Sequence, residues 1–438
     1  MKKYNSSKNI TRIFACICCI VLLSTTIVSC GFYGDENATL DSSGYTMLLD
    51  ADTSGTVTVL GNYDNFEALD SAISKFANYY PNISVEYEKL DDYNTNILTR
   101  LQNDDSASIF MINRYNFLEA PGLEDIIYDV SDLDINFDDI DKDAYEACYI
   151  DGKLFGIPLW YRYYGMVVNE DLLEKEGLSI PENLDELENC LKVLKNAGYT
   201  PIQQANSGLP HFFISDFMNI VAHDLTTDEI EALKNGDENA ASKVSSCFET
   251  MFDMIEKGYI SLDNAKTYED NYNDAILKFF EGDVPFLAAS TQIYSGMAKR
   301  ESKSDAYKEN SFTYSFNYIP LSSDGTQLYK TVDTGFALNK NCSNLDIASE
   351  FYRFMYTKEI LKDFSTIKGI PTTATDKDGT PLGNLPNVDS SLLVVTGDID
   401  DEKDVIQDIY TNVSVQIFSG EITDTDGAIT AFKDAISN

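Results

Sequence analysis

The chain has 438 residues, of which 72 are acidic and 32 are lysine or arginine, so its formal net charge at pH 7 is −40. This excess of negative charge repels nucleic-acid phosphates and anionic lipid headgroups, so no nucleic acid partner is expected. At roughly 150 residues per domain, the length predicts two or three domains, or two large ones.

The first 29 residues have the pattern of a secretory signal. All four charges before Cys30 are basic and end at Arg12, and residues 13–28 form an uncharged apolar run. The four residues that end at Cys30, IVSC, resemble a bacterial lipobox, which implies cleavage before Cys30 and a lipid on its thiol. The alternative is a plain membrane span, although the run is short for the usual span of about 20 residues. We expect an exported protein that is lipid-anchored to the outer face of the cell membrane.

Residues 30–54 are small, acidic and polar, and we expect them to form a flexible tether. Of the eight cysteines, four lie beyond Cys30. They are widely spaced, without the close pairs of a metal site. Two disulfides and four buried free thiols are both compatible with the sequence.

A strand–helix–strand unit follows the tether. Residues 56–60 are rich in β-branched side chains, residues 66–80 carry apolar side chains at helical spacing, and residues 83–87 alternate like a strand. This order within about 30 residues predicts a βαβ unit and a parallel sheet.

Two polar loops follow strands of this first unit. Tyr63 and Asp64 come after the first strand, and Asn113 and Arg114 come after a short apolar strand at residues 108–112. Ligands gather at the carboxyl ends of strands in open α/β sheets. We expect these four residues to line one crevice.

Residues 151–176 contain the chain's only tryptophan, within the sequence WYRYY at residues 160–164. An apolar run ends at Pro158 before this cluster, and a second apolar run follows it. The pattern predicts a crossing between two lobes with a binding surface at the crossing, although an aromatic strand edge in a core is an equal alternative. In an extended segment, alternate residues from Trp160 point one way and alternate residues from Tyr161 the other, so the rings that touch a ligand are left open.

The rest of the chain alternates helices with short strands. Residues 201–208, with Gln203 and Asn206, are predicted to form another binding loop, and Thr291 and Gln292 follow an apolar strand at residues 284–289. Further predicted elements are a helix from 181 to near 198, a mostly helical region at 211–253, a helix at 275–283, strands at 312–320 and 331–338, and helices at 347–355, 404–418 and 426–436.

Taken in order, these motifs make the chain resemble the extracellular solute-binding proteins of family 1, the maltodextrin-binding-like receptors of ABC importers. The resemblance covers nearly the whole chain after Cys30. The motifs that carry it are FANYYPNI at 76–83, DGKLFGIP at 151–158, VNEDLL at 168–173, FEG at 280–282, TGFAL at 334–338, ASEF at 348–351 and GIP at 369–371.

The resemblance implies an α/β, two-lobed periplasmic-binding-protein-like fold, in which each lobe is a mostly parallel sheet flanked by helices and the ligand lies between the lobes. Lobe 1 would take residues 55–159 and 336–375, and lobe 2 residues 160–335 and 376–438. The resemblance implies two partners, a small-molecule solute of the sugar class and the membrane permease of an ABC importer. A monomer is expected.

Eleven residues match the ligand-contacting loops of the family. They are Tyr63, Asp64, Asn113, Arg114, Trp160, Tyr161, Arg162, Gln203, Asn206, Thr291 and Gln292. The polar residues 290–292, which follow a predicted strand, lack the tryptophan that many relatives carry there. The resemblance therefore does not imply that maltodextrin is the ligand of this chain. Because two of the eleven are arginines, neutral and acidic sugars are both left open.

Catalytic patterns are missing from the sequence. There is no Gly-x-Ser-x-Gly elbow and no phosphate-binding Gly-x-x-x-x-Gly-Lys, and the two histidines, His211 and His223, do not sit in a metal-binding pattern. We expect no enzyme activity, no cofactor and no metal. The alternatives to a transport receptor are a surface-anchored sensor or adhesion protein with the same fold, a binder of a non-sugar solute, or a secreted polysaccharide-active enzyme.

Overall fold

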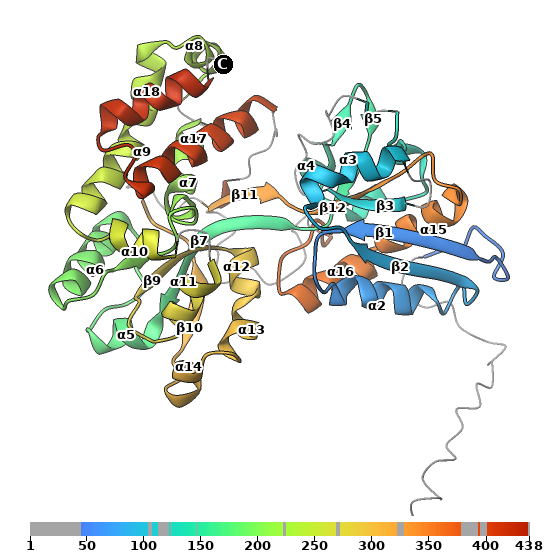
Figure 1. Cartoon of the computed structure of the whole chain (residues 1–438), viewed down its shortest axis with the longest axis horizontal. Coiled ribbons are helices and arrows are strands. Elements are labelled where there is room, and N and C mark those ends of the chain that lie inside the picture. Colours follow the sequence, from blue (N-terminus) through green and yellow to red (C-terminus); the bar gives the residue numbers. More distant parts are fainter. Residues whose placement is uncertain are drawn as a thin grey trace, which may run out of the picture. The chain divides into compact units, whose positions relative to one another are not determined.

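A computed structural model gives the fold of this chain. It describes residues 45–103, 107–112, 122–123, 125–146, 148–221, 225–268, 272–321, 328–377, 393–394 and 401–436. Within this part the chain forms two main β-sheets, each flanked by helices, as Figure 1 shows. The α/β fold class predicted from the sequence is confirmed.

The first sheet has the strand order β2-β1-β3-β12-β6. Its strands are β1 (Gly55–Gly61), β2 (Ile83–Lys89), β3 (Ala107–Ile112), β6 (Ile157–Pro158) and β12 (Gly335–Leu338). β1 pairs in parallel with both β2 and β3, which confirms the predicted βαβ unit, whereas β12 runs antiparallel to β3 and β6. Every residue of the central strand β3 is buried, as expected for a strand covered on both faces.

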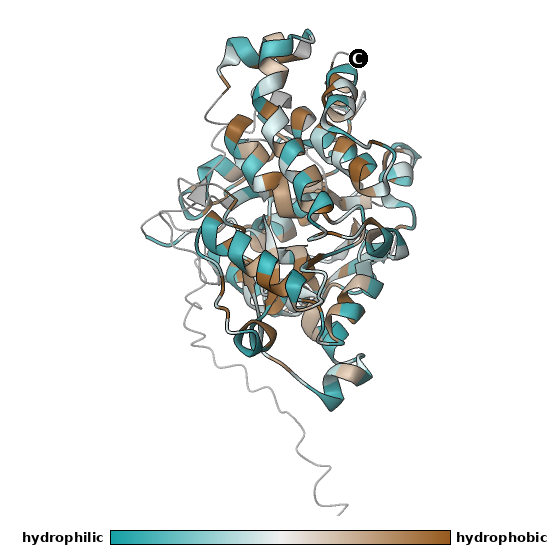
Figure 2. Cartoon of the chain, turned by 90° about the vertical axis from the view of Figure 1, so that its left-hand side faces the viewer, coloured by the Kyte–Doolittle hydropathy of each residue, from teal (hydrophilic) through white to brown (hydrophobic). Residues whose placement is uncertain are grey.

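Helices α2 (Glu67–Phe76), α3 (Tyr93–Asn103), α15 (Leu345–Met355) and α16 (Lys358–Lys368) contribute to the core around this sheet. In α2 the buried side chains Leu69, Ala72 and Phe76 recur at helical spacing and form one apolar face. α16 ends at Gly369, whose left-handed backbone (φ 67°) is a common helix terminator. In Figure 2 the outer helices carry both hydrophilic and hydrophobic residues, as amphipathic helices do.

The second sheet has the order β13-β11-β7-β9-β8, with β10 also paired to β7. Its strands are β7 (Tyr161–Asn169), β8 (Ile202–Gln203), β9 (Phe286–Ser290), β10 (Tyr314–Asn317), β11 (Leu328–Val332) and β13 (Leu393–Val394). β7 is antiparallel to β9, β10 and β11, so the expectation of a mostly parallel sheet is wrong here. The reason for the β7–β11 pair is that β7 leaves the first sheet after Trp160, whereas β11 returns to it at Asp333, so the two strands run in opposite directions.

The remaining helices follow in chain order, and most of them pack around the second sheet. They are α4 (Lys142–Glu146), α5 (Glu170–Lys175), α6 (Leu184–Asn196), α7 (Pro210–Asn219), α8 (Thr227–Lys234), α9 (Glu238–Glu256), α10 (Leu262–Thr267), α11 (Tyr272–Phe279), α12 (Thr291–Ser295), α13 (Met297–Glu301), α14 (Asp305–Glu309), α17 (Asp401–Ser419) and α18 (Thr425–Ile436). The short elements η2 (Val130–Asp132), η3 (Phe137–Asp139), β4 (Tyr149–Ile150) and β5 (Lys153–Leu154) lie before the first crossing. The helices predicted near residues 181, 211–253, 404 and 426 are thus present.

The first described residues pack against the body, which corrects the predicted extent of the tether. Tyr45 is buried, with 6% of its surface exposed. Its hydroxyl donates to Glu350 Oε1 at 2.5 Å, and Leu48 N donates to the same oxygen at 3.0 Å. A flexible segment therefore does not extend to residue 54, because an aromatic ring and a buried carboxylate hold residues 45–48 in place.

The four cysteines of the described part, Cys148, Cys190, Cys247 and Cys342, are free and buried. The sequence allowed either two disulfides or four free thiols, and the structure shows four free thiols. Among the described residues no helix has the length and apolar character needed to cross a membrane. The predicted signal and Cys30 lie outside the described residues.

Candidate ligand-binding site

Three segments of the chain lie side by side where it passes between the two sheets. One segment, Leu159 and Trp160, joins β6 to β7, and another, Asp333 and Thr334, joins β11 to β12. Asp333 N donates to the carbonyl oxygen of Trp160 at 2.9 Å, and Leu159 N donates to that of Thr334 at 2.8 Å. The third segment follows α16, and its Thr372 forms an antiparallel β-bridge with Trp160. These pairings hold side chains of both sheets in fixed register at the crossing.

The sequence predicts one strand at 331–338, and this expectation is wrong. The stretch is divided, because β11 ends at Val332 in the second sheet and β12 begins at Gly335 in the first. The two residues between them, Asp333 and Thr334, are buried and turn their polar side chains into the crossing. The break thus puts a carboxylate between the two sheets.

Asp333 is the centre of a polar cluster formed with three side chains. It accepts from Trp160 Nε1 at 3.3 Å, from Arg162 Nη2 at 2.8 Å and from Gln292 Nε2 at 2.5 Å. Only 4% of Asp333 is exposed. Because a buried carboxylate is costly unless donors and a cation compensate it, this cluster fixes the positions of its three partners. We call Trp160, Arg162, Gln292 and Asp333 the crossing cluster.

Arg162 is the partly open member of the crossing cluster. Its side chain is 37% exposed, while its Nε atom is buried without a hydrogen-bond partner. Burial by itself lowers the pKa of this guanidinium, but the Asp333 carboxylate together with the Tyr164 and Tyr63 hydroxyls outweighs burial and raises it. Arg162 is therefore a permanently charged donor whose charge is balanced by Asp333 and whose hydrogen bonds are incompletely used.

Trp160 lies in the first core. It is 1% exposed, and its ring lies 6.1 Å from that of Phe66 and 6.3 Å from that of Phe364. Trp160 thus packs with the first sheet, although the sequence assigns it to the second lobe. Its indole edge reaches the crossing cluster, and its faces contact protein. Truncating it would open a cavity in this core.

Alternation along β7 puts Tyr161 and Tyr163 on the face opposite to Arg162. The Tyr161 hydroxyl donates to Asp141 Oδ2 at 2.6 Å, and the ammonium of Lys330 lies 4.2 Å from the Tyr161 ring centroid. Tyr161 and Tyr163 are both buried, with their rings 6.2 Å apart. Tyr161, a predicted site residue, therefore belongs to a buried cluster behind the crossing.

Gln203, Asn206 and Thr291 form buried polar positions at the ends of β8 and β9. Thr291 Oγ1 accepts from Tyr163 N at 3.1 Å, and Asn206 Oδ1 accepts from Ser207 N at 2.7 Å. Gln203 is 8% exposed, and its Oε1 has no hydrogen-bond partner. A buried amide oxygen without a donor is uncommon in folded proteins and calls for an explanation.

Tyr63 connects the loop after β1 to the crossing. Its hydroxyl lies 3.1 Å from Thr334 Oγ1. Burial raises the pKa of Tyr63, and the nearby carboxylate of Asp333 raises it further. Tyr63 is thus a neutral hydroxyl next to the crossing cluster, contributed by the first sheet.

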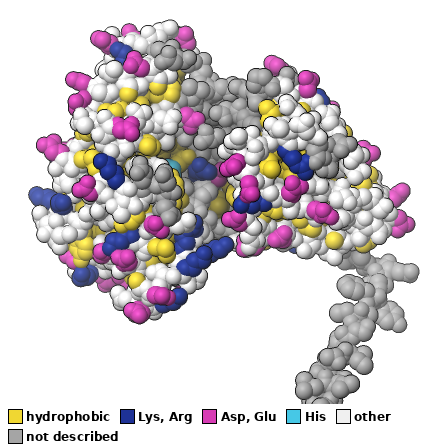
Figure 3. Space-filling view, viewed as in Figure 1, with side chains coloured by type: hydrophobic (Ala, Val, Ile, Leu, Met, Phe, Trp, Pro, Cys, Tyr) yellow, Lys and Arg dark blue, Asp and Glu magenta, His cyan; other side chains and the backbone are white. Residues whose placement is uncertain are grey.

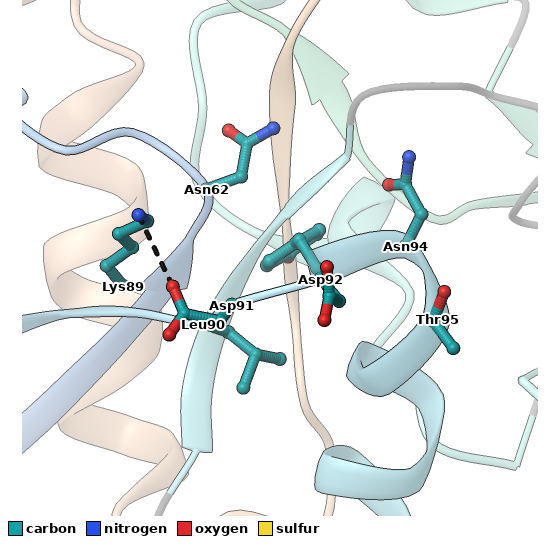
Figure 4. Close-up of a pocket in the computed structure, with 8 residues that line it drawn as sticks. Asn62, Lys89, Leu90, Asp91, Asp92, Asn94 and Thr95 are labelled. Carbon is teal, nitrogen blue, oxygen red and sulfur yellow. Dashed lines mark ion pairs between the residues drawn. The ribbon is translucent and has the colours of Figure 1, made fainter.

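Asp64 points away into solvent. Its side chain is 89% exposed and pairs with Lys89 at 2.7 Å, and the hydrogen bond from Lys89 lowers its pKa. Next to it, a hollow of about 730 Å³ opens at the carboxyl ends of β1 and β2. Figure 4 shows this hollow, with Lys89 paired to Asp91 and with Asn62 and Asn94 nearby.

The structure brings five of the predicted residues together at or beside the crossing: Tyr63, Trp160, Arg162, Thr291 and Gln292. Gln203 is the last residue of the neighbouring strand β8, opposite Leu287 and away from the crossing, and Asn206 follows that strand. Tyr161 lies behind the crossing and Asp64 is on the surface. Asn113 and Arg114 lie outside the described residues. In Figure 3 the surface is hollowed between the parts built on the two sheets, and lysine or arginine side chains lie along the hollow.

Sequence reasoning missed two residues, Asp333 and His211. Asp333 stands in TVDTG, and the signal that could have found it is an acidic residue inside an apparent strand. His211 lies in the first turn of α7 with its ring centroid 5.0 Å from that of Tyr164, on the same face of β7 as Arg162. Among the described residues, no group of three or more His, Cys, Asp or Glu side chains could hold a metal ion.

Comparison with known families gives one match. A model of the family described as bacterial extracellular solute-binding protein matches residues 71–381. A comparison with curated protein sequences gives no match.

Solved structures of similar fold cover most of the chain. The GacH receptor of Streptomyces glaucescens GLA.O, solved unliganded and with acarbose, has a TM-score of 0.68 and 14% identity, covering 88% of this chain and 98% of its own. RafE from Streptococcus pneumoniae, in its apo form, has a TM-score of 0.64 and 15% identity, covering 88% and 97%. A binding protein of an ABC transporter from Bifidobacterium animalis subsp. lactis, in complex with mannobiose, has a TM-score of 0.62 and 18% identity, covering 88% and 95%. At these identities the similarity establishes the shared fold.

Proposed function

Because the chain belongs to the bacterial extracellular solute-binding proteins, we propose that it captures a small neutral carbohydrate and delivers it to the permease of an ABC importer. The proteins of this family are non-enzymatic carriers for transporters, so the site is a binding site. The observation that carries the carbohydrate proposal is the crossing cluster together with the unused hydrogen-bonding atoms beside it. Three solved structures of the same fold, with acarbose, raffinose and mannobiose, support the same class of ligand.

The side chains near the crossing suit hydroxyl groups. Sugar recognition needs planar amide, carboxylate or guanidinium groups that can bind several hydroxyls, in a pocket with few polar groups of fixed position. Arg162, Gln292 and Asn206 are such groups, and Tyr63 adds a hydroxyl. The unpartnered Nε atom of Arg162 leaves one donor of this group unsatisfied.

The charge balance favours a neutral ligand. Arg162 was the reason to consider an acidic sugar, but Asp333 Oδ1 lies 2.8 Å from its Nη2. An acidic ligand would face this buried carboxylate across one guanidinium, and like charges at short range repel. A neutral sugar can use the free edge of the guanidinium without adding charge.

Delivery requires that ligand binding favours a closed arrangement of two lobes. We propose lobes with the boundaries expected from the sequence, except that Trp160 packs with lobe 1. A ligand that contacts both lobes only in the closed form shifts an existing equilibrium by its difference in affinity. Tyr63 from the first sheet and Arg162 from the second, both adjacent to Asp333, would give such a ligand contacts on each side.

Export and anchoring complete the proposal. We infer that residues 1–29 are a signal, that Cys30 carries a lipid on the outer face of the membrane and that the tether ends before Tyr45. The receptor would act as a monomer and contact the permease with its strongly acidic surface. Mass spectrometry of the membrane fraction tests the anchor, since lipidation of Cys30 adds the mass of acyl chains and Cys30→Ala removes it.

A thermal-shift screen tests the ligand class. Neutral mono- and oligosaccharides are compared with uronic acids, peptides and polyamines, and glycerol at equal concentration controls for general stabilisation by polyols. A ligand specific to the folded state and present at about 100 times Kd adds about 2.7 kcal/mol to the free energy of unfolding. We expect a shift with at least one neutral saccharide. A shift with peptides or polyamines and with no saccharide contradicts the proposal, and a shift with uronic acids alone contradicts the neutral class.

A surface sensor or adhesion protein would bind the same sugar but would not support import. Uptake of labelled ligand by cells that carry or lack the chain separates the two functions.

A further inference from the structure

The imidazole ring of His211 lies within the electrostatic influence of Arg162 and makes no hydrogen bond within the described part of the chain. It is in the first turn of α7, partly exposed, and its ring is tilted by 56° against Tyr164, with the centroids 5.0 Å apart. Tyr164 in turn stacks on Tyr329 at 5.7 Å. The ring is therefore held by an aromatic stack and not by polar partners.

The two ring nitrogens have different surroundings. Nδ1 is buried and has no hydrogen-bond partner. In a neutral imidazole one nitrogen carries the proton and the other is an acceptor. A proton on Nδ1 would be a buried N–H without an acceptor, which is the more costly arrangement. The proton is therefore on Nε2, at the part of the ring that is not enclosed.

Burial, together with one neighbouring cation, keeps this ring neutral. Burial lowers the pKa of His211 to about 3, and the Arg162 cation contributes in the same direction. The other titratable groups near the ring are the phenols of Tyr164 on β7 and Tyr329 on β11, and Asp333, which is paired with Arg162. A second proton would have to go onto the buried Nδ1 next to a guanidinium.

We propose that His211 is a specificity-determining residue that offers Nε2–H as a fixed, uncharged donor to an oxygen of the ligand, near the partly exposed Arg162. This inference rests on the proposed function and identifies one contact of the same site. An uncharged donor beside a balanced arginine accepts hydroxyl or ether oxygens of a neutral sugar and gives no attraction to a carboxylate beyond that of Arg162. It also gives binding that does not change with pH in the range where ordinary histidines titrate.

The state of the ring can be measured without ligand. Long-range proton–nitrogen NMR spectra of the ligand-free protein, with His223→Gln used to assign the two histidines, report the tautomer and its titration. We expect the Nε2–H tautomer and no titration of His211 between pH 5 and pH 8. The Nδ1–H tautomer, or a midpoint near the usual value of about 6.5, overturns the inference.

The role in binding is measured with two variants and the saccharide found in the screen. His211→Gln keeps an N–H donor near the position of Nε2, whereas His211→Phe keeps the ring and removes the donor. We expect Kd to rise about tenfold in His211→Phe, the usual effect of one lost hydrogen bond, and to stay within about threefold in His211→Gln. Urea unfolding of both variants checks that the fold is retained.

The outcomes separate the two proposals. Unchanged saccharide binding by a folded His211→Phe overturns the role of His211 and leaves the carbohydrate function standing. Equal losses in His211→Phe and His211→Gln also overturn it, because the donor would then not be what matters. If the unmodified protein binds no saccharide, the carbohydrate function fails, and the role of His211 fails with it.

Discussion

Two buried carboxylates, Glu350 and Asp333, are each paired with an arginine, yet their surroundings differ. Glu350 is 2% exposed and accepts from Tyr45, Tyr80 and Arg353 at 2.5, 2.6 and 2.7 Å. Its partner Arg353, 6% exposed, also donates to the carbonyl and the carboxylate of Asp134, both at 3.0 Å. Each charged group of this pair has several partners within the protein.

The pair at the crossing is incomplete. Asp333 has three side-chain donors, but its partner Arg162 is 37% exposed with a buried, unpartnered Nε. His211 Nδ1, on the same face of β7 as Arg162, also has no partner. A polar network that is fully satisfied makes a fold rigid, whereas one that is partly satisfied can accept a ligand. We propose that the same chemical pair stabilises structure in one place and supports ligand binding in the other.

The largest expected effect is on stability, in Glu350→Ala. The substitution leaves the Arg353 charge and the hydroxyls of Tyr45 and Tyr80 without their acceptor in a buried place. Removing one partner of a buried ion pair costs about 3–5 kcal/mol. We expect the free energy of unfolding in urea to fall by this amount, with ligand affinity unchanged in the folded protein. A loss of affinity without loss of stability would mean that the contrast between the two carboxylates is wrong.

The surface pair of Lys75 and Glu359 gives a matched control. Its side chains are 36% and 33% exposed, so Glu359→Ala should lower the free energy of unfolding by at most about 1 kcal/mol.

The pH dependence of stability provides a second check on Glu350. Burial raises the pKa of Glu350, but the hydrogen bonds from Tyr45, Tyr80 and the backbone of Leu48, together with the Arg353 charge, outweigh burial, so the net pKa is lowered. This stabilisation is present above the unfolded pKa of about 4.3 and is lost as pH falls through the folded pKa, and Glu350→Gln should remove that dependence.

The next largest effect is expected in Asp333→Asn, which keeps the shape of the side chain and removes its charge. Arg162 then has a charge without a balancing carboxylate, and we expect a loss of stability of about 1–3 kcal/mol. Affinity for the neutral saccharide should fall at least tenfold, while uronic acids should bind more tightly than before. Calorimetric titration with both ligands measures the change in preference. Reduced stability with unchanged Kd for both ligands would make Asp333 a structural residue like Glu350.

Local patterns in the sequence were enough to predict much of the fold. The helical spacing of residues 66–80 and the β-rich runs on either side gave the βαβ unit, and Pro158 followed by WYRYY marked the crossing. The direction of Trp160 could not be predicted, because Phe66 and Phe364, which decide it, are distant in sequence. Asp333 is 171 residues from Arg162, and no local pattern connects them. His211 has no feature in the sequence beyond its place at the start of a helix.

The smallest effect is expected in Tyr63→Phe, which removes the hydroxyl that lies 3.1 Å from Thr334 Oγ1. One hydrogen bond of this kind contributes about 0.5–1.5 kcal/mol. Tyr87→Phe is the matched control, because its hydroxyl bonds the backbone of the same loop at Tyr63, at 2.9 and 3.0 Å, and does not bond to the crossing. Both variants should lose similar stability in urea. If the crossing couples the first sheet to the ligand, only Tyr63→Phe also weakens saccharide binding, by a few-fold in Kd. If the two variants bind the saccharide with equal affinity, Tyr63 does not contribute to binding. The ligand contacts would then come from the second sheet, which carries Arg162, and the loop after β1 would support only the fold.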